Sequence, residues 1–66
     1  MNLKAELINA DRTARAARAK ADRLYRVALE SGHPGDCPGL YEAADVAARE
    51  ADYLEEEVTH LRRLAQ

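Results

Sequence analysis

The sequence has little from which to build a large core. Its 66 residues include no Phe, no Trp and a single Met, and although 47% of the residues are hydrophobic, 14 of them are alanine. Alanine adds little side-chain volume, so the chain cannot enclose the core of a large enzyme. We therefore expect one small, non-enzymatic domain spanning residues 1–66.

Excess charge of one sign and cysteine pairs are lacking as well. The formal net charge is −2, without the strong basic excess of a dedicated nucleic-acid binder, so nucleic acid is not an expected partner. One cysteine cannot form an internal disulfide, so either the compartment is reducing, which makes the cytoplasm the expected location, or Cys37 pairs between chains. No run is apolar enough for a signal peptide or a membrane span, and we expect no membrane partner.

Helix-breaking residues are confined to one short segment. All three glycines, both prolines and the cysteine lie within residues 32–39. The sequence on either side is rich in Ala, Leu, Arg and Glu, which are strong helix formers. The sequence therefore predicts an all-α antiparallel two-helix hairpin. The expected parts are a first helix over about 3–31, a loop over 32–37 and a second helix over about 38–65.

Three residues mark the expected helix ends. Asn2 is a suitable N-cap for the first helix. Gly32 suits the left-handed position that follows a helix end. Pro38 has the fixed φ angle that favours the first position of the second helix.

Both predicted helices carry an apolar seam with the spacing of a coiled coil. Seam positions alternate steps of three and four residues, as heptads do. In an antiparallel hairpin, seam residues whose numbers add to 68 face each other, so that Leu24 faces Ala44 and large side chains meet small ones. The seam residues are Leu3, Leu7, Ala10, Ala14, Ala17, Ala21, Leu24 and Ala28 in the first helix and Leu40, Ala44, Ala47, Ala51, Leu54, Val58, Leu61 and Ala65 in the second.

Opposite charges support this pairing of the helices. Residues 1–30 hold seven Lys or Arg and four acids, whereas residues 38–66 hold three Lys or Arg and seven acids. Lys20 and Glu50 flank the seam at about the same height. An exposed pair of this kind adds only about 0.2–1 kcal/mol, so it affects orientation more than stability.

The alanine-rich seam suggests that the hairpin does not act alone. Only seven of its sixteen residues are larger than alanine, which gives little apolar burial to offset the conformational entropy of ordering the chain. We expect a homodimeric four-helix bundle first and a higher, ring-like oligomer second. The candidate interface residues, all apolar or aromatic and outside the seam, are Tyr25, Val27, Leu29, Tyr41, Val46 and Tyr53.

Arginines on the first helix offer a candidate anion site. Arg15, Arg18 and Tyr25 share one flank, Tyr41 stands beside Tyr25 across the seam, and Arg26 lies nearby. Guanidinium groups bind phosphate or carboxylate, and tyrosines stack on bases, so the group is a candidate nucleotide site. The alternative is a solvated helix face on which acids such as Asp11 and Asp22 pair with the arginines. The tyrosines would then be interface anchors.

Metal and thiol chemistry have weak support. His33 and Cys37 are four residues apart in the predicted loop, but zinc takes three or four protein ligands and His60 is about 30 Å along the second helix. Cys37 at a helix N-terminus would favour its thiolate, yet the chain offers no substrate pocket beside it. We expect no metal, no cofactor and no catalytic residue.

Three functional hypotheses remain, of which the third is a structural coiled-coil piece of a larger assembly. The first is a homo-oligomeric binding protein that contacts a protein partner as an adaptor, inhibitor or regulator. The second is a sequestering protein, or sponge, that holds a small anionic ligand such as a nucleotide signal at subunit interfaces. Length favours the first, because 66 residues can present a rigid surface more readily than a pocket.

Overall fold

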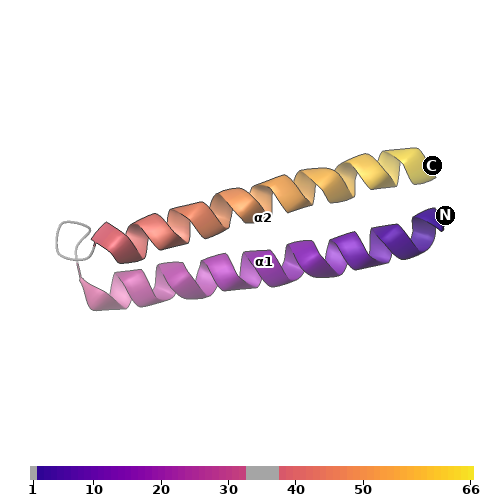
Figure 1. Ribbon diagram of the computed structural model, residues 1–66. Helices are drawn as coiled ribbons and strands as arrows, with labels where there is room; N and C mark the ends of the chain where they lie inside the picture. Colours follow the sequence, from indigo (N-terminus) through magenta and orange to yellow (C-terminus); the bar gives the residue numbers. More distant parts are fainter. Residues whose placement is uncertain (1, 33–37) are drawn as a thin grey trace.

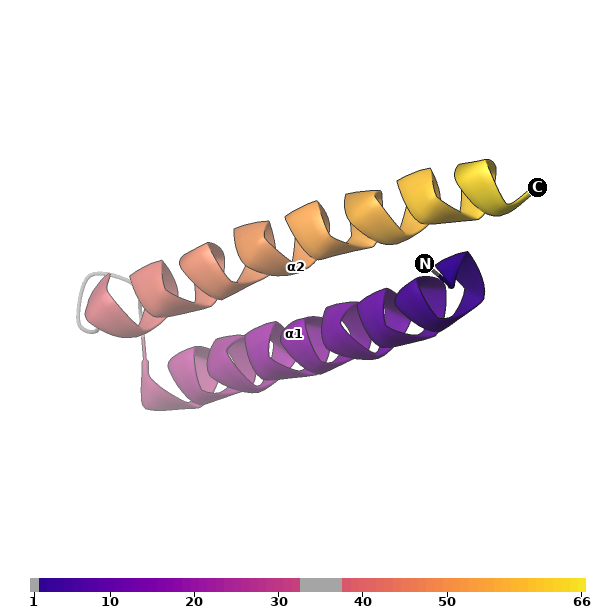
Figure 2. The ribbon, with the colours of Figure 1, turned by 45° about the vertical axis from the view of Figure 1, so that its right-hand side comes forward.

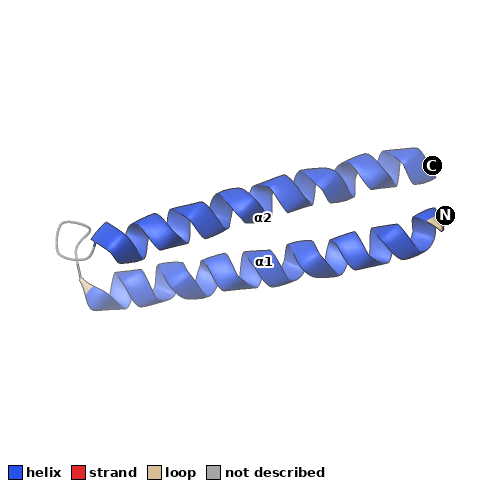
Figure 3. Ribbon diagram, viewed as in Figure 1, coloured by secondary structure: helices blue, strands red, loops and turns tan. Residues whose placement is uncertain are grey.

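The computed structural model describes residues 2–32 and 38–66, which contain two long helices. Helix α1 spans Leu3–Ser31 and helix α2 spans Pro38–Ala65. They lie side by side and antiparallel, with the two ends of the chain at the same end of the molecule (Figure 1). All of the regular structure in the described residues is helical (Figure 3). The predicted all-helical hairpin is confirmed.

The start of α1 has the predicted cap. Asn2 has an extended backbone, and its side-chain oxygen accepts hydrogen bonds from the backbone N–H groups of Lys4, at 3.1 Å, and Ala5, at 3.3 Å. The Asn2 carbonyl also accepts from the backbone N–H of Glu6 at 3.1 Å. These bonds satisfy N–H groups that have no partner within the helix, so Asn2 fixes where α1 begins.

The end of α1 differs from the prediction in its details. Gly32 has φ 131° and ψ −159°, whereas a left-handed helical cap has both angles positive, so the predicted left-handed conformation is wrong. Glycine still accounts for the position, because only a residue without Cβ adopts this combination of angles readily. The chain therefore leaves α1 in a more extended direction than such a cap would give.

Alanine makes up six of the seven buried residues in the described part of the chain. The hairpin is narrow, measuring 48 × 15 × 13 Å, and a view turned by 45° shows the same two-rod arrangement (Figure 2). No large side chain in the described residues is fully buried. In these ranges neither helix combines the length and the hydropathy that a membrane crossing requires. The buried residues are Ala14, Ala21, Ala28, Ala44, Ala47, Ala51 and Val58.

Candidate functional site

One broad side of the hairpin carries the polar contacts between α1 and α2 and is called the ion-pair face below. The contacts are made by three residues of α1 and by the residue that follows it. These four residues are seven positions, or about two helical turns, apart: Asp11, Arg18, Tyr25 and Gly32. This spacing places them on one face. Their partners on α2 are Arg62, Glu55, Asp52, Asp45 and Tyr41.

Arg18 is the centre of the ion-pair face. Its Nε donates to Glu55 Oε2 at 3.1 Å and its Nη2 donates to Glu55 Oε1 at 2.8 Å, while Nη2 also bonds Asp52. The hydrogen bond with Glu55, followed by that with Asp52, raises the pKa of Arg18, and the bond with Arg18 lowers the pKa of Glu55. Because a bidentate guanidinium–carboxylate contact is directional, this cluster favours the observed register of α1 against α2.

The two tyrosines of the ion-pair face are also engaged within the chain. The Tyr25 hydroxyl donates to Asp45, which is the main cause of a raised pKa for Tyr25. The Tyr41 hydroxyl donates to the carbonyl of Gly32 at 3.2 Å. Both side chains are half-buried. The hydroxyl group of each tyrosine therefore forms a hydrogen bond that connects α2 with α1 or with Gly32 at its end.

Near the open end, Asp11 joins two arginines. Its carboxylate lies 2.9 Å from Arg15 Nε, one helical turn away, and 3.6 Å from a terminal nitrogen of Arg62. These residues line a depression of about 200 Å³ together with Glu55 and Thr59. Two carboxylates therefore balance the two arginines in this depression.

The candidate anion-binding residues divide between two locations. Arg15, Arg18, Tyr25 and Tyr41 share the ion-pair face. Arg26 is exposed beyond this group and makes no ion pair within residues 2–32 and 38–66. Arg15 pairs with Asp11, one of the two acids named in the alternative of a solvated helix face.

Asp22 was an expected partner of the arginines, whereas three carboxylates on α2 were not expected to be partners. Asp22 makes no ion pair in the described part of the chain. The acids that bond Arg18 and Tyr25 are instead Asp45, Asp52 and Glu55. The four candidate residues on the ion-pair face are therefore bonded within the hairpin.

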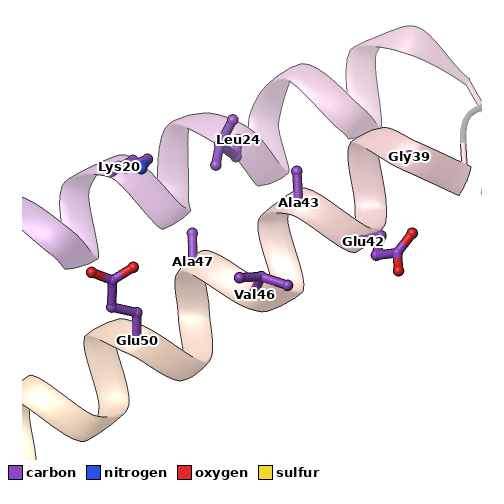
Figure 4. Close-up of a pocket in the computed structure, with 8 residues that line it drawn as sticks. All are labelled: Lys20, Leu24, Gly39, Glu42, Ala43, Val46, Ala47 and Glu50. Atoms are coloured by element: carbon purple, nitrogen blue, oxygen red, sulfur yellow. The ribbon is translucent and has the colours of Figure 1, made fainter.

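The opposite broad side, called the groove face below, contains a more apolar hollow. A groove of about 480 Å³ runs between α1 and α2, with Lys20 and Leu24 on one wall (Figure 4). Both Lys20 and Glu50 line it, but the described residues show no ion pair within 4 Å between them. The other lining residues are Gly39, Glu42, Ala43, Val46 and Ala47.

Large apolar side chains are exposed beside this groove. Val46 is 57% exposed, Tyr53 is 65% exposed and Val27 is 46% exposed. Tyr53 follows Val46 by seven residues and Val27 follows Lys20 by seven, so helical spacing places all three on the groove face. Leu29 is 69% exposed but lies four residues after Tyr25, on the side of the ion-pair face.

The candidate metal ligands His33 and Cys37 lie outside the described residues. Among residues 2–32 and 38–66, no group of three or more His, Cys, Asp or Glu side chains is placed to hold a metal ion. His60, the remaining candidate, is exposed on α2.

Comparisons with known proteins add no relatives. No family model matches the sequence, and no curated protein or solved structure matches it.

The Arg18 cluster is expected to make stability depend on acid pH. The pKa of Glu55 lies below its ordinary value of 4.5 in the folded chain, so the stabilisation is complete above that value and is lost as pH falls through the lowered pKa. Thermal unfolding followed by circular dichroism should show Arg18→Gln melting a few degrees below the parent protein at neutral pH, with the difference vanishing in acid. Arg12→Gln, at an exposed position without an ion pair, is the control. A difference that stays constant with pH would contradict this role of Glu55.

Proposed function

We propose that the chain is a small, non-enzymatic, homo-oligomeric binding protein that acts in the cytoplasm as an adaptor, inhibitor or regulator through protein–protein contacts. The observation that carries the proposal is that small side chains are buried while several large apolar side chains are exposed, the reverse of an ordinary core. Six of the seven residues that are buried in the described ranges are alanine, whereas Val46, Tyr53 and Leu29 expose more than half of their surface. Exposed apolar surface of this kind is typical of contacts with other chains.

The packing of α1 on α2 favours self-association. We propose that the alanines form a coiled-coil seam in which the helices approach closely, with heptad spacing on both sides. Alanine contributes less apolar burial than the branched side chains of an ordinary coiled coil. Association of several hairpins would bury the larger apolar side chains and supply the missing stabilisation, in a dimeric bundle or a larger ring.

The form of the hairpin favours a protein partner. Both described faces are long, shallow surfaces on rigid helices, with the apolar Leu29 beside the charged ion-pair face. A helix or a flat protein surface can cover such a face, whereas a small ligand is better held in a concave site.

A sponge for a small anionic ligand such as a nucleotide is the second candidate. It is supported by the gathering of Arg15, Arg18, Tyr25 and Tyr41 on one face. An anion at Arg18 would have to displace the carboxylates of Asp52 and Glu55, which now hold its guanidinium group. This competition makes the sponge the weaker of the two proposals.

Native mass spectrometry of the intact purified protein separates these proposals. We expect a homo-oligomer that retains a protein partner, and we expect Leu29→Lys to weaken that retention without changing the subunit number. Ala19→Lys, at an exposed position on the outer edge of α1, is the control. A retained nucleotide that is lost in Arg18→Gln and kept in Arg12→Gln would establish the sponge instead. A monomer that retains neither would contradict both.

A further inference from the structure

The groove face combines apolar surface with charges that have no partner in the hairpin. Leu24, Val46 and Ala43 line the groove, and the charges of Lys20 and Glu50 border it without an ion pair in the described residues. On the other side of the hairpin the interhelix charges are paired. The groove face is therefore the side on which apolar and charged groups both remain available to another chain.

Small and large residues occur at matched heights on this face. The contacts of Arg18 with Asp52 and of Tyr25 with Asp45 join residues whose numbers add to 70. Those of Asp11 with Arg62, Arg18 with Glu55 and Gly32 with Tyr41 join residues whose numbers add to 73. The cross-helix contacts therefore depart from the predicted sum of 68, and residues of α1 and α2 whose numbers add to about 70 lie at similar heights. Lys20 is then level with Glu50. Two further level pairs are Val27 with Ala43 and, to within one residue, Ala16 with Tyr53.

If two copies were related by a two-fold axis parallel to the helices, the level residues of one copy would face each other's counterparts in the second copy. Such an axis preserves height and lays α1 of each copy against α2 of the other, antiparallel. Lys20 then meets Glu50 of the second copy, and Tyr53 covers Ala16 of the second copy. Bulky residues opposite small ones pack without voids, and both contacts occur twice by symmetry.

A two-fold axis perpendicular to the helices would bring like charges together. It lays α1 on α1 and α2 on α2, so that the Lys20–Glu50 contacts are lost. Lys20 and Arg23 of α1 would then face α1 of the second copy. Glu50 and Glu57 of α2 would face α2 of the second copy. Charge complementarity therefore selects the axis parallel to the helices.

We propose that a second copy of this chain occupies the groove face, forming an antiparallel four-helix bundle with both loops at the same end. This deepens the proposed function and rests on it, since it names the self-association surface. The outline of the hairpin measures 48 × 15 Å, or about 700 Å² in projection, which is of the same order as the roughly 800 Å² of accessible surface that each partner buries in a specific interface. The ion-pair face and Leu29 remain accessible for a protein partner.

The first test reverses charges in separate chains. Lys20→Glu alone, or Glu50→Lys alone, places like charges at both symmetric contacts and should weaken self-association by about tenfold. Mixing the two variants restores opposite charges at both contacts, so hetero-dimers should form with close to the parent affinity. An effect within one chain would not be repaired by mixing. Native mass spectrometry with one variant labelled with heavy nitrogen measures the proportions.

The control for this test uses exposed charges on the outer edges of the helices. Arg12→Glu and Glu56→Lys should leave self-association unchanged, and their mixture should give statistical proportions of hetero-dimer. If the Lys20 and Glu50 variants behave like these controls while the parent protein is an oligomer, the inference is overturned and the proposed function survives. If the parent chain is a monomer at all concentrations, both fail.

The second test determines the direction of packing. In a Cys37→Ser background, a mixture of the Ala16→Cys and Tyr53→Cys variants should oxidise mainly to the hetero-disulfide. Preferred disulfides between two Ala16→Cys chains would indicate the perpendicular axis and overturn the proposal. A mixture of the Ala19→Cys and Glu56→Cys variants, at exposed outer positions, is the control. A yield of hetero-disulfide from the Ala16→Cys and Tyr53→Cys mixture that is no higher than in this control would overturn the proposal as well.

Discussion

Replacing Ala21 with aspartate is expected to unfold the hairpin. Ala21 has no exposed surface and lies between the two helices, where a carboxylate would be removed from water without a partner. Burying an unpaired charge costs several kcal/mol, which is comparable with the whole stability of a small domain, about 5 kcal/mol. Far-ultraviolet circular dichroism of Ala21→Asp at room temperature should therefore show a large loss of helical signal.

Ala19→Asp is the matched control for this substitution. Ala19 is exposed and lies two residues before Ala21 on the same helix, so both variants carry the same loss of helix propensity. Ala19→Asp should remain folded with a slightly lower melting temperature. Equal losses of helix in the two variants would show that Ala21 does not lie in the interface between the helices.

Replacing Ala51 with leucine is expected to lower the free energy of unfolding by about 1–3 kcal/mol, the usual cost of overpacking a filled core. Ala51 has no exposed surface, so the additional side-chain volume must push α1 and α2 apart at that level. Urea denaturation monitored by circular dichroism at fixed protein concentration measures the change.

The control for Ala51→Leu is Ala19→Leu, which adds the same volume at an exposed position and should change stability by less than about 0.5 kcal/mol. A gain in stability from Ala51→Leu would mean that the seam accepts larger side chains. The close approach of the helices would then not be a requirement of the fold.

The hairpin could be predicted from the sequence because its local signals agree. Helix breakers are confined to one segment and the remaining residues favour helix. Asn2, a good N-cap residue, lies directly before the first helix. Gly32 shows the limit of this reasoning, since the residue type indicates that an unusual φ angle is allowed but does not determine ψ. The rest of the loop lies outside the described residues.

The ion-pair face was harder to predict, although a signal was present. Asp11, Arg18 and Tyr25 recur every seven residues on α1, and Glu55 and Arg62 do the same on α2. The predicted pairing, in which facing residue numbers add to 68, would have placed Arg18 level with Glu50 and not with Glu55, which it contacts. Long charged side chains also have several accessible rotamers, so spacing alone could not decide between pairing within α1 and pairing across to α2.

The difference between the two faces connects the fold to the proposed function. Ion pairs and tyrosine hydrogen bonds on one side hold α1 and α2 in register, which keeps the opposite side in a fixed shape. A preformed surface loses less conformational entropy on binding than a mobile one. We expect this to favour specific contacts by a chain with a very small core.

Analytical ultracentrifugation of the intact protein over a wide range of concentrations tests the central claim most directly. We predict an oligomer with an even number of 7.3 kDa chains, whose melting temperature rises with protein concentration because association stabilises the fold. A single 7.3 kDa species that melts cooperatively at a temperature independent of concentration would contradict the account.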